Sequence, residues 1–376
     1  MREEIHGRSK STWLWKVLCL SLLVFLSSAA SYGAIDNVQV SDNDEGKQFD
    51  ARSVIIDHVL DSYEWHLLDI GEKDITIHLP VILFYESSLY VFSSRRFEHG
   101  EASHKNFAIA DEGRRKGRVI RVLDDGQTPD PEAATIYDLS MTKTVLAVFI
   151  ASFLLCWLFV SVGKKYRGAD VYSTPKGLPL LFEPLILFVR DQIAILAIGP
   201  DRYHRFMPYL LTAFFFIFFN NLLGLVPFFP GGVNITGNIS VTFVLAMFTF
   251  FFTHWYANRH YWKQMFNMPG VPVFLKFPVP ILPLVEVMGA FIKPFTLMIR
   301  LFANMTAGHM VILSLTSLIF VLGSVSALIG YSVSPLTVLF LVFLNFLKIL
   351  VSFLQAYIFT LFSAFFFGMA VPKGAH

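Results

Sequence analysis

The fold of this chain is decided by the stretch Lys293-Pro-Phe-Thr-Leu-Met-Ile-Arg300-Leu-Phe-Ala-Asn304-Met-Thr-Ala-Gly-His309, which places an arginine within apolar sequence. Residues 284–320 are almost wholly apolar around Arg300. A guanidinium at bilayer depth costs about 3 kcal/mol or several times more, and it cannot escape by losing its proton. We therefore treat Arg300 as a candidate functional residue. The alternative is a side chain that extends to the lipid headgroups, which the apolar residues on both sides disfavour.

The composition is that of an integral membrane protein with a polar N-terminal part. The chain has 376 residues, of which 55% are hydrophobic and 15% charged, against about 25% charged in soluble domains. No basic stripe with interleaved aromatic residues indicates nucleic-acid binding. Cys19 and Cys156 each lie in an apolar run and predict neither a disulfide nor a metal site. No phosphate-binding glycine-rich loop is present, so we expect no nucleotide chemistry and no cofactor in this chain.

The first residues are typical of a secretory signal. Basic residues precede a short apolar run at 17–26, and small residues follow it. We expect a signal peptide over residues 1–34, cleaved near Ala30. An uncleaved anchor helix is the alternative, although the run is short against the about 20 residues of a span.

Residues 35–140 are polar and are expected to form a small, mixed, β-containing extracytoplasmic domain. Segments 75–79, 81–85 and 88–92 have the β-branched and aromatic character of strands. Val54–Leu60 is a candidate short helix. The histidines of this part lack metal-ligand spacing, and no catalytic constellation is apparent.

Residues 141–370 are expected to form an all-α polytopic membrane domain. Apolar runs predict spans over 145–162, 206–226 and 239–256. An amphipathic helix is expected at the interface over 175–198. A loop that carries Arg259, Lys263 and Lys276 and several prolines follows the third span.

Two long apolar segments, 281–322 and 335–370, complete the domain and are joined by a charge-free loop over 323–334. As helices they would be roughly 63 and 54 Å long at about 1.5 Å per residue, whereas the hydrocarbon core is about 30 Å thick. We therefore expect a hairpin of two strongly tilted antiparallel helices. The alternatives are a break, for which Pro294 offers a kink, and additional crossings.

The basic residues predict the orientation. Lys and Arg follow the first and third spans, and Lys373 lies in the tail over 371–376, whereas the opposite loops carry no charge. By the positive-inside rule the basic loops and the tail are cytoplasmic. The N-terminal domain is then extracytoplasmic, in agreement with a signal peptide, and the chain is expected in a bacterial inner membrane.

Few polar groups lie within the hairpin, and their spacing predicts an ion path. At about 100° per residue, Glu286 and Arg300 fall within about 40° of each other, and His309 lies about 180° from Arg300. Antiparallel pairing would place Gln355 level with Arg300 and Lys348 level with His309. A fixed cation between two polar half-routes blocks a proton wire and attracts a mobile carboxylate.

Each of these residues also has a structural explanation. Glu286 could form an interfacial ion pair with Lys293, and His309 could bond a backbone carbonyl. Gln355 and the asparagines could join helices by hydrogen bonds. Arg300 has the weakest alternative of this kind.

The Lys293–His309 motif, together with Leu354-Gln355-Ala-Tyr-Ile-Phe-Thr360, resembles subunit a of the F-type ATP synthase. Segments 206–227 and 236–242 add to the resemblance, which covers about residues 140–370. It implies a proton-channel stator subunit that contacts a rotating ring of c subunits, b-type peripheral-stalk subunits, other ATP synthase subunits and membrane lipid.

The resemblance also implies roles for individual residues. Arg300 matches the family's essential arginine, which faces the ring carboxylate, and Gln355 matches the glutamine beside it. His309 falls in the outer half-channel and Glu286 in the cytoplasmic one. Lys348 departs from the family, which usually has His or Glu there, and Asn238 stands where many members have Asp. Asn304, one turn from Arg300, completes the expected proton pathway.

Two other functions compete with this one. A proton-coupled secondary transporter would need a midplane substrate site and commonly internal repeats, and neither is apparent. A membrane receptor would bind a ligand through the N-terminal domain but would have no use for Arg300.

Overall fold

The computed structural model describes residues 61–70, 73–100, 102–110, 116–123, 125, 128–130, 133–167, 177–226, 229, 231–266 and 281–371. The expected signal peptide over 1–34 and the candidate helix at Val54–Leu60 lie outside these residues. The chain divides into two compact units. One contains residues up to 150, 223–233 and 309–346, and the other contains 151–222, 234–308 and 347–376.

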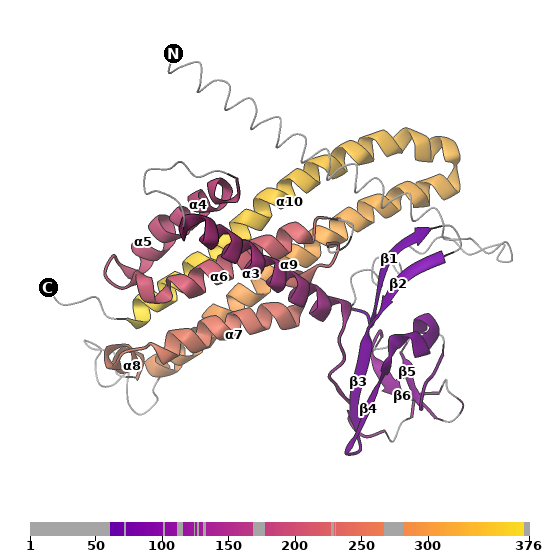
Figure 1. The fold of residues 1–376 in the computed structure, drawn as a ribbon, viewed down its shortest axis with the longest axis horizontal. Helices are drawn as coiled ribbons and strands as arrows, with labels where there is room; N and C mark the ends of the chain where they lie inside the picture. The colour runs from indigo at the N-terminus through magenta and orange to yellow at the C-terminus, as the bar shows by residue number, and fades with distance from the viewer. Residues whose placement is uncertain are drawn as a thin grey trace, which may run out of the picture. The chain divides into compact units, whose positions relative to one another are not determined.

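The first unit contains a small β domain whose strands form three antiparallel sheets (Figure 1). Strands β2, β3 and β4 cover the segments with strand-like sequence. The sheets have the orders β1-β2, β4-β3-β7 and β5-β6. The strands are β1 (Glu64–Ile70), β2 (Lys73–His78), β3 (Pro80–Tyr85), β4 (Ser88–Ser93), β5 (Phe107–Ile109), β6 (Val119–Arg121) and β7 (Tyr137–Asp138), with a 3₁₀ helix, η2 (Ser94–Gly100), after β4.

The β domain has its own hydrophobic core. Alternate residues of β3 (Val81, Leu83 and Tyr85) are buried and pack with Phe97 and Phe107. This alternation is the period of two that a pleated strand imposes. The core therefore lies on one face of the β4-β3-β7 sheet.

Tyr63 and Ser62 form hydrogen bonds with later parts of the chain. Its hydroxyl donates to the Asp138 carboxylate and accepts from the backbone N–H of Val119. Burial, and then the hydrogen bond to Asp138, raise the pKa of the Tyr63 hydroxyl. Next to Tyr63, the carbonyl of Ser62 accepts from the N–H of Lys143 at 2.9 Å. The domain is thus bonded to the first residue of the helix that follows.

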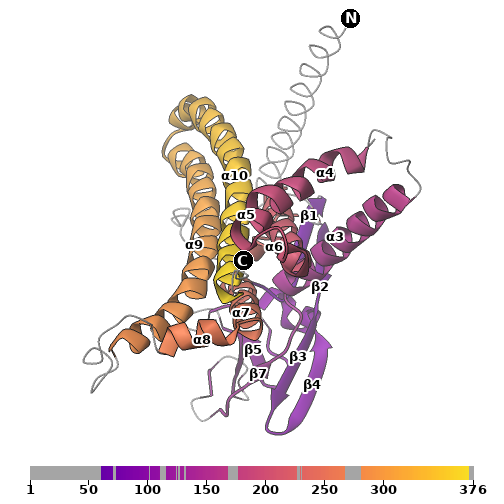
Figure 2. The same ribbon diagram turned by 90° about the vertical axis from the view of Figure 1, so that its left-hand side faces the viewer.

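The described residues after β7 are mainly helical (Figure 2). The expected span at 145–162 becomes α3, and the expected helix at 175–198 becomes α4, a π-helical turn η4 and α5 in succession. Gly199 ends α5 with a φ of 103°, a backbone conformation that glycine adopts and residues with side chains rarely do. The elements are α3 (Lys143–Arg167), α4 (Leu178–Phe188), η4 (Val189–Ala194), α5 (Ile195–Ile198), α6 (Tyr203–Leu223), η5 (Ile235–Gly237), α7 (Ile239–Trp255), α8 (Arg259–Phe266), α9 (Ile281–Val325) and α10 (Ala327–Ala370).

Four of these helices are long and apolar enough to cross a membrane: α3, α6, α9 and α10. Helix α7 is apolar but has 17 residues, which is about 26 Å at 1.5 Å per residue. The all-α membrane part predicted from the sequence is confirmed at this level. Helices α9 and α10 contain 45 and 44 residues, and their tilt in a bilayer stays a prediction. Pro294 lies within α9 without ending it.

The prediction of a loop over 323–334 was wrong. Only Ser326 separates α9 from α10, and the N–H of Gly330 donates to its carbonyl at 3.0 Å. A Cβ on Gly330 would lie 2.8 Å from the Cα of Gly323. Because the two glycines have no side chains, the backbones meet closely enough for both helices to continue to the turn. Pro335, the expected start of the second helix, lies within α10.

The prediction of a loop from Arg259 was also wrong at its start, because α8 begins there. The side-chain oxygen of Asn258 accepts from the N–H of Arg259, and the N–H of Trp262 donates to the Asn258 carbonyl. Met265 is buried on the inner face of this helix. An asparagine directly before a helix can satisfy the free N–H groups of its first turn. The basic residues that follow Asn258 had led us to assign this segment to a loop.

Phenylalanine rings dominate the core of the second unit. Phe206 of α6 stacks on Phe367 of α10 with centroids 4.9 Å apart. Phe214 and Phe215 of α6 are fully buried. Beside them, a Cβ on Gly368 would lie 2.2 Å from the carbonyl oxygen of Ala197 in α5. This core fixes α5, α6 and the C-terminal part of α10 against one another, which positions the polar residues of the hairpin.

Candidate functional site

Arg300 lies half-buried in α9, and its guanidinium contacts an aromatic ring. The Cζ atom is 5.2 Å from the ring centroid of Phe362 in α10, within the range of a cation–π contact. Among the residues that the structure describes, no carboxylate forms an ion pair with Arg300. A cation–π contact contributes about 0.5–2 kcal/mol, less than the cost of bringing a guanidinium to bilayer depth. The chain alone therefore leaves Arg300 under-compensated.

Lys348 of α10 packs across a glycine of α9. A Cβ on Gly308 would meet the Cε atom of Lys348 at 3.0 Å and its Nζ at 3.8 Å. Because Gly308 has no side chain, the aliphatic part of Lys348 can pack against α9 at this position. Lys348 is half-buried, and its backbone carbonyl accepts from the hydroxyl of Ser352.

The other expected pathway residues lie in different surroundings. Gln355 is 5% exposed in α10. Asn304 is exposed, and His309 is half-buried. Asn238 caps α7, because its side-chain oxygen accepts from the N–H of Ser240 at 2.9 Å. Its oxygen is thus committed to the helix end, a structural task that the sequence did not indicate.

The loop before α7 is held against α9. The carbonyl of Gly237 accepts from the hydroxyl of Thr306 at 3.3 Å, two residues beyond Asn304. Asn234 in turn accepts from the N–H of Gly237 through its side chain. The loop that carries Asn238 therefore lies beside the part of α9 that follows Arg300.

Glu286 lies half-buried near the start of α9, close to α8. Burial and the Glu286 carboxylate raise the pKa of the Tyr261 hydroxyl in α8. Tyr261 also lines, with His254, Lys293 and Pro294, a cavity of about 10 Å³, which is room for about one water molecule. Neither His254 nor Tyr261 was predicted from the sequence, since their positions in different helices gave no spacing signal.

A second polar cluster, also missed, lies at the end of α6. Asn220 and Asn221 are 2% and 3% exposed. The Asn221 side-chain oxygen accepts from the hydroxyl of Thr236 at 2.5 Å. Among the described residues, Asn220 Oδ1 and Asn221 Nδ2 have no hydrogen-bond partner. Buried amides without partners are costly, and two consecutive asparagines in an apolar run were the available signal.

The structure gives three of the expected residues identifiable neighbours. Lys348 lies against Gly308, Arg300 against a ring two turns beyond Gln355, and Glu286 beside α8. In the part of the chain that the structure describes, no cluster of His, Cys, Asp and Glu could hold a metal ion.

Comparison with known families assigns the helical part. The family model described as ATP synthase A chain matches residues 145–368, from the second residue after the start of α3 to near the end of α10. The chain belongs to the ATP synthase subunit a family. It is also an integral membrane protein, in keeping with its four long apolar helices. Members of this family are subunits of a proton-translocating enzyme complex.

Individual relatives agree with this assignment. ATP synthase subunit a of Chloroherpeton thalassium is 45% identical over 244 residues, covering 64% of this chain and 69% of the relative. Subunit a 2 of Chlorobaculum tepidum is 40% identical, covering 62% and 64%. Subunit a of an Anaeromyxobacter species is 42% identical, covering 64% and 56%. The three matches cover between 56% and 69% of each relative.

The β domain matches a different family model. Residues 54–139 match a domain of unknown function (DUF8433). The boundary between the two matches falls at residues 139–145, where the chain passes from β7 into α3. The polar N-terminal part is therefore a separate family domain joined to subunit a.

Proposed function

We propose that this chain is the stator subunit of an F-type ATP synthase and forms two proton half-channels against a rotating ring of c subunits. A b-type peripheral stalk would hold it against rotation. The observation that carries the proposal is Arg300, which lies within a 45-residue apolar helix and pairs with no carboxylate among the described residues. A ring carboxylate from outside the chain would supply the missing partner.

The contacts along the hairpin support two separate half-routes. Along α9, Gly308 and His309 lie on one side of Arg300 and Glu286 lies on the other, and Lys348 of α10 packs against Gly308. The small cavity beside Lys293, Tyr261 and His254 adds a polar space near the Glu286 end. Protons would arrive past His309 and Lys348 and leave past Glu286.

Arg300 would separate the two half-routes. Its fixed positive charge repels a proton that moves directly from one to the other, and it attracts a deprotonated ring carboxylate. A carboxylate that has taken a proton loses this attraction and can rotate into the lipid. Proton flow is then coupled to rotation, and nucleotide chemistry takes place in other subunits.

The test is ATP-driven proton pumping in membrane vesicles that carry the assembled complex with Arg300→Ala. Pumping should fall to background, because the ring carboxylate loses its counter-charge and the half-routes are no longer separated. The control is Arg259→Ala in α8, which removes an exposed arginine of the same chain and should leave pumping intact. Vigorous pumping by the Arg300→Ala complex would disprove the proposal.

The proposal also predicts what co-purifies with the chain. A gently solubilised preparation should contain c, b and nucleotide-binding subunits of the synthase. A chain isolated alone under conditions that preserve membrane complexes would instead favour a proton-coupled secondary transporter.

A further inference from the structure

The β4-β3-β7 sheet is apolar on both faces. One face carries Val81, Leu83 and Tyr85 into the domain core. The opposite face, called here the outer sheet face, consists of Ile82, Phe84, Leu89, Val91, Tyr137 and Leu139. The strand register places these residues together, because Phe84 pairs with both Leu89 and Tyr137, Ile82 pairs with Val91, and the N–H of Leu139 donates to the carbonyl of Ile82.

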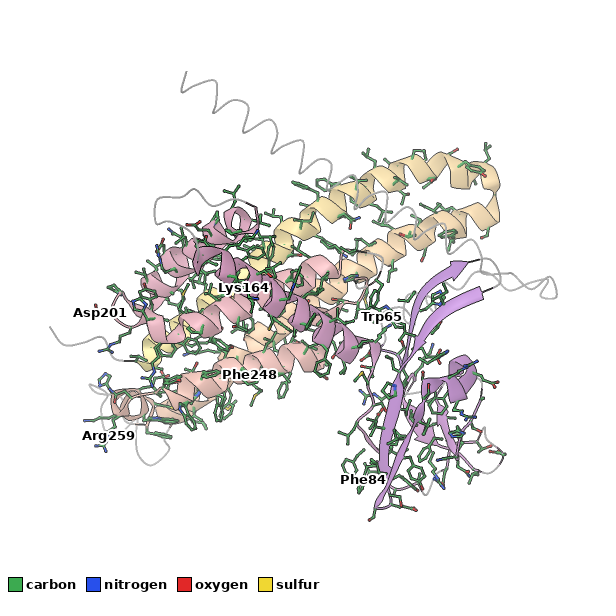
Figure 3. The ribbon with its side chains drawn as sticks, viewed as in Figure 1. Trp65, Phe84, Lys164, Asp201, Phe248 and Arg259 are labelled. Carbon is green, nitrogen blue, oxygen red and sulfur yellow. The ribbon has the colours of Figure 1, made fainter. Side chains whose placement is uncertain are left out.

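The outer sheet face is exposed in the isolated chain. Phe84, Leu89 and Val91 are 41%, 63% and 57% exposed, and Tyr137 and Leu139 are 64% and 68% exposed. Phe84 lies near the tip of the β3–β4 hairpin, so the apolar surface runs along the strands (Figure 3). Antiparallel sheets with one solvated face usually place polar residues there. A contiguous apolar patch of this kind marks a surface that is covered in use.

The connection to α3 indicates what covers it. Leu139 precedes Lys143, the first residue of a membrane-spanning helix, by four residues, a reach of at most about 14 Å. The N–H of Met141 donates to the carbonyl of Pro80 at 3.1 Å, and the N–H of Lys143 donates to the carbonyl of Ser62. One end of the sheet is therefore bonded to the segment that enters the bilayer, so the nearest extended apolar phase is the lipid itself.

We propose that the outer sheet face lies on the lipid bilayer, with its strands along the membrane surface. Tyr137 is of a residue type enriched at membrane interfaces. The exposed Arg95 and Arg96 follow β4 at the end of the sheet nearest α3, where they can contact anionic headgroups. The β domain would thereby act as a membrane-surface anchor beside the first span.

The test places a nitroxide spin label at Leu89→Cys in a Cys19→Ser and Cys156→Ser background. The intact complex is reconstituted in vesicles of phosphatidylethanolamine and phosphatidylglycerol. Collisions of the label with oxygen, which concentrates in lipid, are compared with collisions with a water-soluble nickel complex. The oxygen-to-nickel ratio at Leu89→Cys should exceed several-fold that at Ser103→Cys, an exposed position outside the outer sheet face. Val91→Cys provides a second label on the same face.

Two results would overturn the proposal. Nickel collisions that dominate at both Leu89→Cys and Val91→Cys would show that the face is in water. Collisions that are slow with both reagents would show that another protein surface covers it. Because the label reports only the surroundings of the β domain, either result would leave the proposed role of Arg300 untouched.

Discussion

Single residues of α9 and α10 decide how polar groups are held in apolar surroundings. Arg300 lies over an aromatic ring, and no carboxylate of the described residues forms an ion pair with its guanidinium. Gly308 provides space for the stem of Lys348. In both cases a neighbouring residue without charge sets the position of a charged one.

Gly308→Val should displace Lys348, because even a Cβ would stand 3.0 Å from the Lys348 Cε atom. We expect ATP-driven pumping by the assembled complex to fall several-fold, since the lysine loses its place beside α9. Gly289→Val in the same helix is the matched control, because a Cβ there meets nothing within 4 Å. Equal pumping by the two variants would contradict a role for the position of Lys348.

Glu286→Gln should slow proton transport while the protein stays folded. The substitution keeps the size of the side chain but removes a carboxylate that the proposed cytoplasmic half-route uses, and Glu286 is only half-buried. Pumping rates and the melting temperature of the purified complex, measured together, separate the two effects. Glu183→Gln in α4, which removes the charge of the carboxylate that accepts from the Tyr166 hydroxyl, is the control for loss of a carboxylate elsewhere. An unchanged pumping rate in Glu286→Gln would exclude this residue from the route.

Helix packing depends on close approaches that glycine permits. Gly330 meets the backbone of Gly323 at the α9–α10 turn, and Gly368 meets the backbone of Ala197. At both places the neighbouring atoms are backbone, which cannot swing aside as a flexible side chain does. The first contact allows α9 and α10 to extend to the turn. The second allows α5 to pack closely against α10.

Gly368→Ala should therefore destabilise the second unit. Its Cβ would lie 2.2 Å from the Ala197 carbonyl oxygen, and overpacking of this kind costs about 1–3 kcal/mol. We expect a lower melting temperature of the purified protein in detergent. Gly163→Ala in α3, where a Cβ meets nothing within 4 Å, should be neutral or slightly stabilising because alanine favours helix. An undiminished melting temperature in Gly368→Ala would show that α5 can move away without cost.

The molecule joins two family domains with different chemistry. Residues 54–139 match a domain of unknown function, and residues 145–368 match subunit a. The first has a β core in which Tyr63 contacts both β6 and β7, and the second has a phenylalanine-rich core between helices. The basic residues predict that the β domain is extracytoplasmic and that the basic loops of the membrane domain are cytoplasmic.

The predicted orientation can be tested with a membrane-impermeant maleimide on intact cells whose outer membrane has been made permeable. Ser103→Cys in the β domain should react at once, whereas Arg259→Cys in α8 should react only after the inner membrane is opened. Both are introduced with Cys19 and Cys156 replaced by serine. Immediate labelling of Arg259→Cys would reverse the orientation derived from the basic loops.

The membrane class and the main helices could be predicted from the sequence, because apolar runs of span length have few alternatives in a bilayer. The sequence also singled out Arg300, since burying an arginine in such a run has a high free-energy cost. It predicted strands over 75–79, 81–85 and 88–92, where β2, β3 and β4 lie, but not the other four strands. These are local properties, which the composition of a short segment sets by itself.

Only the tertiary structure decided where α9 ends and α10 begins, what surrounds Lys348, and that His254 and Tyr261 line one cavity with Lys293. Gly323 and Gly330 break helices in isolation but permit close packing in a hairpin, so their effect depends on a segment that the local sequence does not include. Likewise, Asn220, Asn221 and Thr236 form one buried cluster only after α6 and the loop before α7 have folded together. Contacts between distant segments follow from packing of the whole chain, which no single stretch specifies.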